Sequence, residues 1–286
     1  MDSPNDRRTP NRSRGGLPPL PRWEDSLAVV TGAGSGIGRV TATTMARLGA
    51  TVVAVDIDGE AAERTAKECG RGHAYEVDVS DAGAMDRLAG DVLGAHGVPH
   101  VVVNNAGVGM SGHFLEVSAD DWAWIVGINL LGVVNGCRSF GAAMVERGSG
   151  HVVNVSSGLA YTPRSTETAY CATKAGVLDL SLALGADWHR HGVGVTAICP
   201  GVINTSILSR ARFVGDRSGE EFRRDVTRLF SRGHDPQQVA DAIVRGVERR
   251  RLVVPVGAEA AVGWFARRIL PIRAVARIAR QQVGGV

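Results

Sequence analysis

Short runs rich in valine and isoleucine recur along the chain, and segments long enough for a helix separate them. The runs cover residues 27–31, 51–55, 74–77, 100–104, 151–156, 193–198 and 251–256. Strands that alternate with helices form βαβ units, and these units assemble a parallel sheet. Because each run is almost continuously apolar, helices are expected to cover both faces of its strand. The sequence therefore predicts an α/β fold, a single Rossmann-type doubly wound domain with a seven-stranded parallel sheet flanked by helices.

Three segments stand apart from this alternation. Residues 1–24 combine Pro, Arg, Ser and Asp with few apolar side chains, so we expect a disordered N-terminal extension. Residues 205–235 read as an amphipathic insertion, and residues 258–286 form a basic tail after the last predicted strand. The remaining chain places the predicted domain at residues 25–257.

Charge and cysteine content exclude several classes of protein. The formal net charge of +3 is concentrated at the C-terminus, where nine arginines and two glutamates follow from Arg245 onward. Basic residues do not alternate with aromatic ones, so we expect no nucleic-acid partner. No uninterrupted apolar run reaches the roughly 18 residues of a transmembrane helix, which predicts a cytoplasmic protein. The four cysteines are far apart and predict neither a disulfide framework nor a metal site: Cys69, Cys137, Cys171 and Cys199.

A glycine-rich turn follows the first predicted strand, where the sequence reads TGAGSGIG over residues 31–38. Glycine lets the backbone adopt positive φ and approach a phosphate closely, and an N-terminal helix turn then offers free N–H groups to the charge. The turn predicts a nucleotide site through Gly32, Ser35, Gly36, Ile37 and Gly38. Taken alone, it is also compatible with a tight strand-to-helix turn that binds nothing.

Tyr170 and Lys174 are four residues apart in a segment of helical period, so their side chains share one helix face. The chain contains two lysines against thirty arginines, and one of the two lies here. A nearby ammonium lowers the pKa of a phenol, which is about 10 in a free tyrosine. The pair therefore predicts a tyrosine that exchanges protons, although an isolated pair of this spacing is often an ordinary surface contact.

Together these motifs resemble those of the short-chain dehydrogenase/reductase family. The resemblance rests on T-G-x-x-x-G-x-G, the N-N-A-G element ending at Gly107, Y-x-x-x-K and the P-G-x-x-x-T element beginning at Pro200, and it covers roughly residues 26–256. It implies a bound nicotinamide cofactor. Besides the glycine-rich turn, it implies that the cofactor contacts Asp56, Asp78, Val79, Asn105, Ala106, Gly107, Tyr170, Lys174, Pro200, Gly201, Ile203 and Thr205.

Asp56 follows the second predicted strand, where a carboxylate accepts hydrogen bonds from the adenosine ribose. A carboxylate also repels a 2′-phosphate, and Ser35 stands where NADP-binding relatives carry a basic residue. We therefore expect NAD(H) to be preferred over NADP(H). Asp58 is a weaker candidate for the same role, and a solvated charge at the strand end is the alternative for Asp56.

The resemblance assigns four catalytic positions. Tyr170 serves as general acid and base, and Lys174 lowers its pKa and holds the ribose. Ser157 orients the substrate oxygen, while Ser156, its neighbour, is expected to point to the other face of the strand. Asn129 is expected to hold a water molecule that feeds protons to the lysine, although a buried asparagine often serves helix packing instead.

These positions predict an NAD(H)-dependent oxidoreductase that interconverts a secondary alcohol and a ketone by hydride transfer. An NADP(H)-dependent carbonyl reductase and a non-catalytic nucleotide-binding regulator on the same fold are the alternatives. An epimerase or dehydratase acting on a nucleotide-sugar is a further one, but such relatives carry a different glycine spacing and a larger C-terminal domain.

Substrate contacts are less constrained. Residues 205–235 occupy the family's lid position, and we call them the lid segment. Its apolar residues either line a pocket or bury the segment's own inner face: Ile207, Leu208, Phe213, Val214, Phe222, Leu229 and Phe230. The expected substrate contacts are Met110, Ser157, Leu159, Tyr161 and Leu208, around an apolar small molecule.

Two kinds of larger partner are expected. The resemblance implies a homodimer or homotetramer built on the helices that carry Asn129 and Tyr170. In the tail, arginines and apolar residues lie on opposite helical faces, as in a basic amphipathic helix. The residues concerned are Arg273, Arg277 and Arg280 on one face, and Ile272, Val275, Ala276 and Ala279 on the other. Such a helix either contacts a membrane surface peripherally or packs on the body or a sister subunit.

Overall fold

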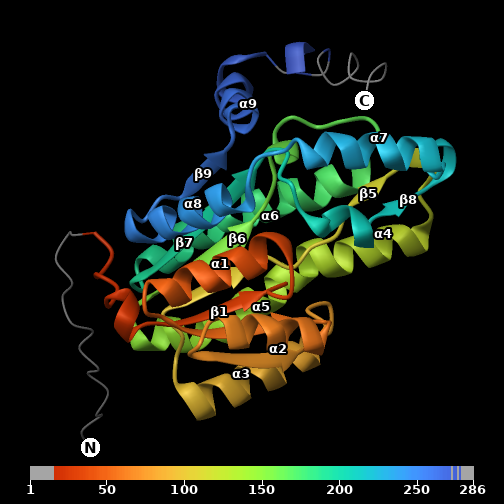
Figure 1. Cartoon of the computed structure of the whole chain (residues 1–286). Helices are drawn as coiled ribbons and strands as arrows, with labels where there is room; N and C mark the ends of the chain where they lie inside the picture. Colours follow the sequence, from red (N-terminus) through yellow and green to blue (C-terminus); the bar gives the residue numbers. More distant parts are fainter. Residues whose placement is uncertain (1–15, 272, 276, 278–286) are drawn as a thin grey trace, which may run out of the picture.

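The structure is a computed structural model that describes residues 16–271, 273–275 and 277 (Figure 1). In the described chain, seven parallel strands form one sheet in the order β3-β2-β1-β4-β6-β7-β9. The strands are β1 (Leu27–Thr31), β2 (Thr51–Asp56), β3 (Gly72–Glu76), β4 (Val101–Asn104), β6 (Gly150–Val155), β7 (Val193–Pro200) and β9 (Val253–Val256). The predicted α/β doubly wound fold is confirmed, with strand ends that differ from the predicted runs by at most two residues.

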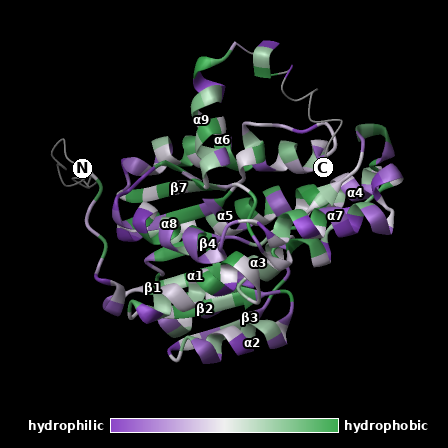
Figure 2. Cartoon of the chain, turned by 45° about the horizontal axis from the view of Figure 1, so that its top comes forward, coloured by the Kyte–Doolittle hydropathy of each residue, from purple (hydrophilic) through white to green (hydrophobic). Residues whose placement is uncertain are grey.

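Helices cover both faces of the sheet, as the apolar runs predicted. The helices are α1 (Gly36–Arg47), α2 (Gly59–Glu68), α3 (Ala82–His96), α4 (Ala119–Val126), α5 (Gly132–Arg147), α6 (Thr168–His189), α7 (Glu220–Ser231), α8 (Pro236–Glu248) and α9 (Ala258–Ile269). Apolar residues of α1 and α8 pack with one set of strand side chains, and those of α3, α5 and α6 pack with the other set. Figure 2 shows green hydrophobic residues on the sheet and purple hydrophilic residues on the outer helices.

Successive residues within each central strand supply the two cores. Val30 of β1 belongs to the core beneath α1 and α8, whereas its neighbour Val29 belongs to the core beneath α3 and α5. Val152 and Val153 of β6 divide in the same way. Successive side chains of a strand point to opposite faces, and a buried valine contributes about 1.5 to 3 kcal/mol. This double burial holds the carboxyl ends of the strands, and the loops that follow them, in place.

One continuous helical segment runs from Ala119 to Arg147, through α4, a π-helical turn (Gly127–Leu131) and α5. Its length and hydropathy would allow it to cross a membrane, but half of its most apolar window is buried inside the protein. Its apolar residues Val133, Phe140 and Met144 belong to the core beneath the sheet. The segment is therefore packed as a core helix.

The first described residues differ from the expected disordered extension. Residues 16–24 lie against the body: Leu20 and Trp23 pack on the core, and Trp23 Nε1 donates a hydrogen bond to Glu248 Oε1 at 3.0 Å. The Pro18 carbonyl accepts a hydrogen bond from the Arg250 guanidinium. A few apolar anchors and one guanidinium thus order a stretch whose overall composition is polar. Residues 1–15 of the predicted extension lie outside the described residues.

The lid segment contains short elements that the sequence did not predict. It begins with a 3-10 helix (Ser206–Arg210) and continues through β8 (Arg212–Phe213), a second 3-10 turn (Gly215–Arg217) and α7. β8 pairs in parallel with β5 (Met110–Ser111), which lies in the loop after β4. Two-residue strands are too short to show a period of two in the sequence. Their pairing connects the lid segment to the carboxyl end of the sheet.

The basic tail begins with α9, which packs on β9 and on a 3-10 turn (Gly158–Ala160). Ala260 and Gly263 are its buried residues, while Val262, Phe265 and Ile269 are exposed beside Arg267 and Arg268. Part of the amphipathic pattern predicted for the tail lies outside the described residues, namely Ile272, Ala276, Ala279 and Arg280.

A buried histidine links β6, β7 and the turn before β9. His151 is fully buried, its Nε2 lies 2.7 Å from Thr196 Oγ1, and its Nδ1 lies 3.0 Å from Arg250 Nη1. Thr196 Oγ1 donates its own proton to the Arg251 carbonyl, so it accepts from Nε2–H and leaves Nδ1 as the acceptor from Arg250. Burial, together with the charge of Arg250, lowers the pKa of His151 to about 3.

Because His151 is buried in its neutral form, we expect the protein to lose stability in acid. The unfolded chain takes up a proton near the ordinary pKa of 6.5, whereas the folded chain does so only near 3. The free energy of unfolding should therefore fall as the pH drops through this window, by up to about 1.4 kcal/mol per pH unit from this group. Denaturant unfolding across the window should show a shallower fall in His151→Gln than in the wild type. Parallel profiles for the two proteins would exclude His151 as the cause.

Candidate functional site

A cavity of about 590 Å³ lies along the carboxyl ends of the strands. Ligands of open α/β sheets bind in this crevice, where loops from several strands meet. Every residue predicted to contact the cofactor lines the cavity except Gly38. Three of the four predicted catalytic residues line it as well, namely Ser157, Tyr170 and Lys174. The fold thus brings together motifs that are far apart in the sequence.

The glycine-rich turn forms one wall of the cavity. Gly32 and Gly36 have φ values of 64° and 51°, in the left-handed region that favours glycine. Gly38 lies behind them in the first turn of α1, where a side chain would collide with the Gly32 carbonyl oxygen. Ser35 makes no capping hydrogen bond within the described chain, which leaves N–H groups at the start of α1 available to an anion.

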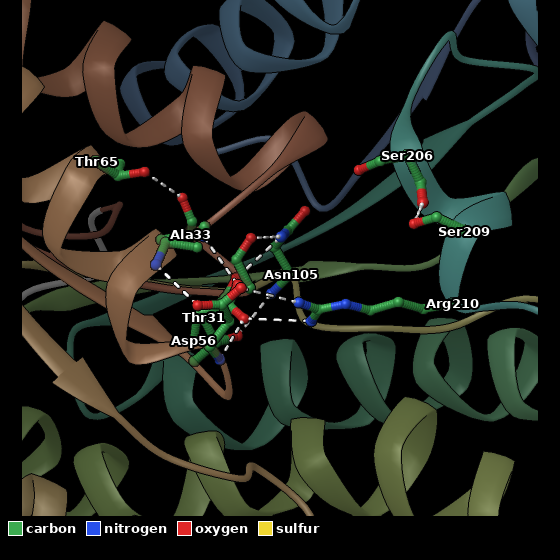
Figure 3. Close-up of polar contacts among 12 residues, drawn as sticks. Thr31, Ala33, Asp56, Thr65, Asn105, Ser206, Ser209 and Arg210 are labelled. Atoms are coloured by element: carbon green, nitrogen blue, oxygen red, sulfur yellow. Dashed lines mark hydrogen bonds and ion pairs between the residues drawn. The ribbon is translucent and has the colours of Figure 1, made fainter.

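Hydrogen bonds between β1 and β4 hold this turn in shape (Figure 3). Asn105 Nδ2 donates to the Thr31 carbonyl at 2.9 Å, and Thr31 Oγ1 accepts from the backbone N–H groups of Asn105 and Ala106 at 3.0 and 3.1 Å. Thr65 of α2 donates to the Ala33 carbonyl at 2.9 Å. The N-N-A-G element therefore connects the glycine-rich turn to the neighbouring strand end.

Asp56 ends β2, and its side chain is 5% exposed. Its carboxylate accepts hydrogen bonds from the Gly34 N–H at 2.8 Å and from the Asp58 N–H at 3.1 Å. Asp58 caps α2, because its side chain accepts from the Ala61 N–H at 2.9 Å. Asp56 is thus held by backbone groups with its carboxylate at the cavity wall, whereas Asp58 is partly committed to the helix.

A lid residue that the sequence did not single out, Arg210, lies beside Asp56 and Asp58. We call these three residues the Asp56 corner. Arg210 Nη1 lies 3.4 Å from Asp56 Oδ1 (Figure 3). Arg210 Nη2 lies 3.6 Å from Asp58 Oδ2. Arg210 is distant from both aspartates in the sequence and belongs to no motif. Only the path of the lid segment over the sheet reveals the contact.

Ser157, Tyr170 and Lys174 meet where β6 ends and α6 begins. Tyr170 and Lys174 lie on the first turns of α6, and the Ser157 hydroxyl, which accepts from the Leu159 N–H at 3.1 Å, is near enough to Tyr170 to lower its pKa. Lys174 Nζ donates to the Val155 carbonyl at 3.0 Å and lies 5.8 Å from the centre of the Tyr170 ring. Ser156, in contrast, donates its hydroxyl to the Lys174 carbonyl at 2.7 Å. Its hydroxyl is therefore engaged in fixing α6 against the sheet.

Burial dominates the pKa values of Tyr170 and Lys174. Burial raises the pKa of Tyr170 to about 12, although the nearby Ser157 hydroxyl acts in the opposite direction. Burial lowers the pKa of Lys174 to about 8. Desolvation thus outweighs the effect of Ser157 on the Tyr170 phenol, and the low tyrosine pKa expected for the working site stays a prediction.

Asn129 lies behind the cavity, in the π-helical turn between α4 and α5. It is fully buried. Its Oδ1 accepts from the Val108 N–H at 2.8 Å, and its Nδ2 donates to the Val108 carbonyl at 2.9 Å. A π-helical turn changes the direction of a side chain within a helix and often occurs at functional sites. Asn129 therefore holds the loop after β4, which carries Gly107. The sequence did not predict this contact between Asn129 and Val108.

Some of the residues predicted to contact the substrate line the cavity. Met110, Leu159 and Leu208 line the cavity, but Tyr161 does not. Tyr161 is 3% exposed, donates to the Ala260 carbonyl at 2.8 Å and packs edge-on against Trp264. The prediction for Tyr161 is wrong, because the turn after Ser157 directs its ring under α9.

The lid segment covers the other side of the cavity. Five of its seven apolar residues named above line the cavity: Ile207, Leu208, Phe213, Leu229 and Phe230. Val214 packs instead with the core near α4, and Phe222 packs against Phe213. Trp124, Arg164 and Glu167 line the cavity too, and the sequence did not single them out. Within the described residues, no group of His, Cys, Asp and Glu side chains is arranged to hold a metal ion.

Comparison with known proteins agrees with this arrangement. The family model described as short chain dehydrogenase matches residues 26–213. The probable oxidoreductase EphD of Mycobacterium tuberculosis is 45% identical over 266 residues, which are 89% of this chain and 45% of that protein. The (3R)-3-hydroxyacyl-CoA dehydrogenase of Canis lupus familiaris is 34% identical over 239 residues, which are 78% of this chain and 89% of that enzyme.

A solved structure shares the fold over most of its length. The crystal structure of a short-chain dehydrogenase/reductase from Burkholderia phymatum in complex with NAD superposes with a TM-score of 0.80 at 29% identity, covering 87% of this chain and 94% of that one. The chain spans about half the length of the mycobacterial relative it matches. The family model, the relatives and the shared fold agree, so the chain belongs to the short-chain dehydrogenase/reductase family of oxidoreductases.

Proposed function

We propose that this protein is an NAD(H)-dependent oxidoreductase that interconverts a secondary alcohol and a ketone, with Tyr170 as general acid and base. One observation carries the proposal: Ser157, Tyr170 and Lys174 line the same cavity as the glycine-rich turn and Asp56. A proton-transferring cluster and a nucleotide cradle in one cavity suit hydride transfer.

The residues at the cavity wall fit a dinucleotide. Glycines at Gly32 and Gly36 let a pyrophosphate approach the backbone at the start of α1. The Asp56 carboxylate, held by two backbone N–H groups, is suited to accept from ribose hydroxyls. The solved relative that binds NAD supports the same assignment. Because a carboxylate repels a 2′-phosphate, NAD(H) is preferred over NADP(H).

The chain's own residues move and hold the proton. When bound, the nicotinamide supplies the acceptor or donor for the hydride of the carbinol carbon. In oxidation, Tyr170 Oη takes the proton of the substrate hydroxyl, and in reduction it returns that proton. Ser157 donates a hydrogen bond to the substrate oxygen and so orients it beside Tyr170.

The protonation state of Tyr170 differs between the two directions of the proposed reaction. A pKa of about 12 keeps the Tyr170 hydroxyl protonated near neutral pH, so it is ready to donate in reduction. Oxidation requires a phenolate, which positive charge beside the ring stabilises. Lys174, with a pKa of about 8, is mostly charged near neutral pH and contributes to that stabilisation. Asn129 acts as a positioning residue, because it holds the loop that carries Gly107.

An apolar substrate fits the remaining walls. Met110, Leu159, Leu208 and lid residues such as Phe213 and Phe230 surround the space beside Tyr170. The relative that acts on 3-hydroxyacyl-CoA supports a secondary alcohol with an aliphatic body as the substrate class.

We further propose a cytoplasmic homodimer or homotetramer built on the helices that carry Asn129 and Tyr170, where Leu131 is 48% exposed. The exposed apolar residues of α9, beside Arg267 and Arg268, support either packing on a sister subunit or peripheral membrane contact for the tail.

A panel of secondary alcohols and ketones tests the proposed reaction. Purified protein with NAD⁺ and each alcohol, or with NADH and each ketone, is followed by the absorbance of the reduced nicotinamide. We expect turnover of secondary alcohols with aliphatic bodies and faster turnover with NAD⁺ than with NADP⁺. Primary alcohols of the same length serve as the control. Tight binding of NADH without turnover of any compound in either direction would support the regulator, and failure to bind either cofactor would exclude both.

A further inference from the structure

The start of the lid segment crosses the cofactor side of the cavity. Thr205 Cβ lies within 3.3 Å of the place where a side chain on Gly36 would begin, and Ser206 follows it there. Four residues after Ser206, at the end of the 3-10 helix, Arg210 reaches Asp56, the last residue of β2 (Figure 3). It also reaches Asp58, which lies just beyond the strand. A single short turn therefore extends from the glycine-rich turn to the Asp56 corner.

The charges in this corner do not balance. Asp56 is 5% exposed, so its carboxylate is poorly screened by solvent, whereas the Arg210 side chain is 51% exposed. Two carboxylates face one guanidinium, at 3.4 and 3.6 Å. The corner keeps a net negative charge, but less of it than Asp56 and Asp58 would produce alone.

We propose that Arg210 is a cofactor-binding residue that weakens the discrimination between NAD(H) and NADP(H). The proposal rests on the function proposed above. The guanidinium lies beside the Asp56 carboxylate, where the ribose hydroxyls of an adenosine would bind. For a cofactor with a 2′-phosphate, the same guanidinium supplies the positive charge that the glycine-rich turn lacks.

The chemistry of arginine suits both parts of this role. Its planar fork binds a phosphate through two parallel hydrogen bonds, and it stays charged at every physiological pH. Its pair with Asp58 is exposed on both sides and contributes little, and its pair with Asp56 is long, at 3.4 Å, with the guanidinium half exposed. Arg210 can therefore leave Asp56 at low cost when ribose hydroxyls replace it. Removing the charge of Arg210 should therefore weaken the binding of NADPH without weakening the binding of NADH.

Binding of NADH and NADPH to the wild type and to Arg210→Gln, measured by titration calorimetry, tests the proposal. We expect the Kd for NADPH to rise about tenfold, as for the loss of one charge-assisted phosphate contact. The Kd for NADH should stay the same or fall, because a competitor for Asp56 is gone. Arg210→Lys keeps the charge without the fork and should give an intermediate ratio of the two constants.

Arg212→Gln is the matched control on the same lid segment. Arg212 also pairs with an aspartate, with Nη1 2.8 Å from Asp121 Oδ1, and its guanidinium lies over the Trp124 ring, away from Asp56. A general loosening of the lid should therefore change both Kd values by similar factors in Arg212→Gln. An unchanged ratio of the two constants in Arg210→Gln, or the same change in both variants, would overturn the role of Arg210. A wild type that binds neither cofactor would instead contradict the proposed function itself.

Discussion

Tyr170→Phe is expected to lower kcat by about 10² to 10⁴-fold, the usual contribution of a positioned general acid or base. The substitution removes one oxygen atom, the one that takes and returns the substrate proton. Tyr170 lines the cavity at the start of α6. Phenylalanine keeps the aromatic ring, which lies 5.8 Å from Lys174 Nζ, so the packing of the ring should survive. The Kd for NADH should therefore stay close to that of the wild type. Steady-state kinetics with the best alcohol of the panel, together with NADH titration, measures both.

Tyr161→Phe is the matched control for this substitution. It also removes a single tyrosine hydroxyl, one that is buried and donates to the Ala260 carbonyl outside the cavity. We expect it to cost about 1 kcal/mol of stability through the lost hydrogen bond, with kcat little changed. If Tyr170→Phe kept near-normal turnover, the proposed proton transfer would be wrong. Equal losses of kcat in the two variants would indicate a general effect of removing a buried hydroxyl.

Gly38→Ala is expected to destabilise the protein and to weaken cofactor binding together. A methyl group at this position would collide with the Gly32 carbonyl oxygen and crowd the Asn105 amide. Overpacking against backbone costs about 1 to 3 kcal/mol, because no flexible side chain can move aside. The displaced Gly32 turn is the cradle proposed for the pyrophosphate, so the Kd for NADH should rise roughly tenfold or more. Thermal unfolding and NADH titration measure the two effects.

Gly90→Ala provides the control for this substitution. Gly90 lies within α3, and nothing is within 4 Å of the place where its side chain would begin. Alanine is the better helix former by about 0.5 to 1 kcal/mol, so this variant should be slightly more stable and should bind NADH normally. A Gly38→Ala protein with wild-type stability and affinity for NADH would contradict this prediction. It would show that α1 and the Gly32 turn can move apart at little cost.

Local patterns predicted most of the fold and much of the cavity. The seven apolar runs became the seven strands, because a strand buried on both faces needs apolar residues at nearly every position. The glycine-rich turn and the Tyr170–Lys174 pair depend on backbone conformation and helical spacing, which a few neighbouring residues determine. These motifs reached one cavity because the carboxyl ends of parallel strands lie at the same edge of a sheet.

Contacts between distant segments were missed for a common reason. Arg210 meets Asp56, Asn129 holds Val108, and Leu20 and Trp23 pack on the core. None of these pairs leaves a periodic or motif-like signal in the sequence. The error at Tyr161 and the strong effect of burial on the pKa of Tyr170 have the same origin, because burial depends on which elements pack together.

The sequence by itself therefore determined the order of strands and helices, the family and the residues that line the cavity at the strand ends, since all of these depend on short-range pattern. Only the tertiary structure decided which side chains are desolvated and which lid residue lies over Asp56. Those features depend on the path of the lid segment, on α9 packing over the turn after β6, and on the π-helical turn that directs Asn129. The acidity of Tyr170 and the charge around the proposed ribose site follow from that packing.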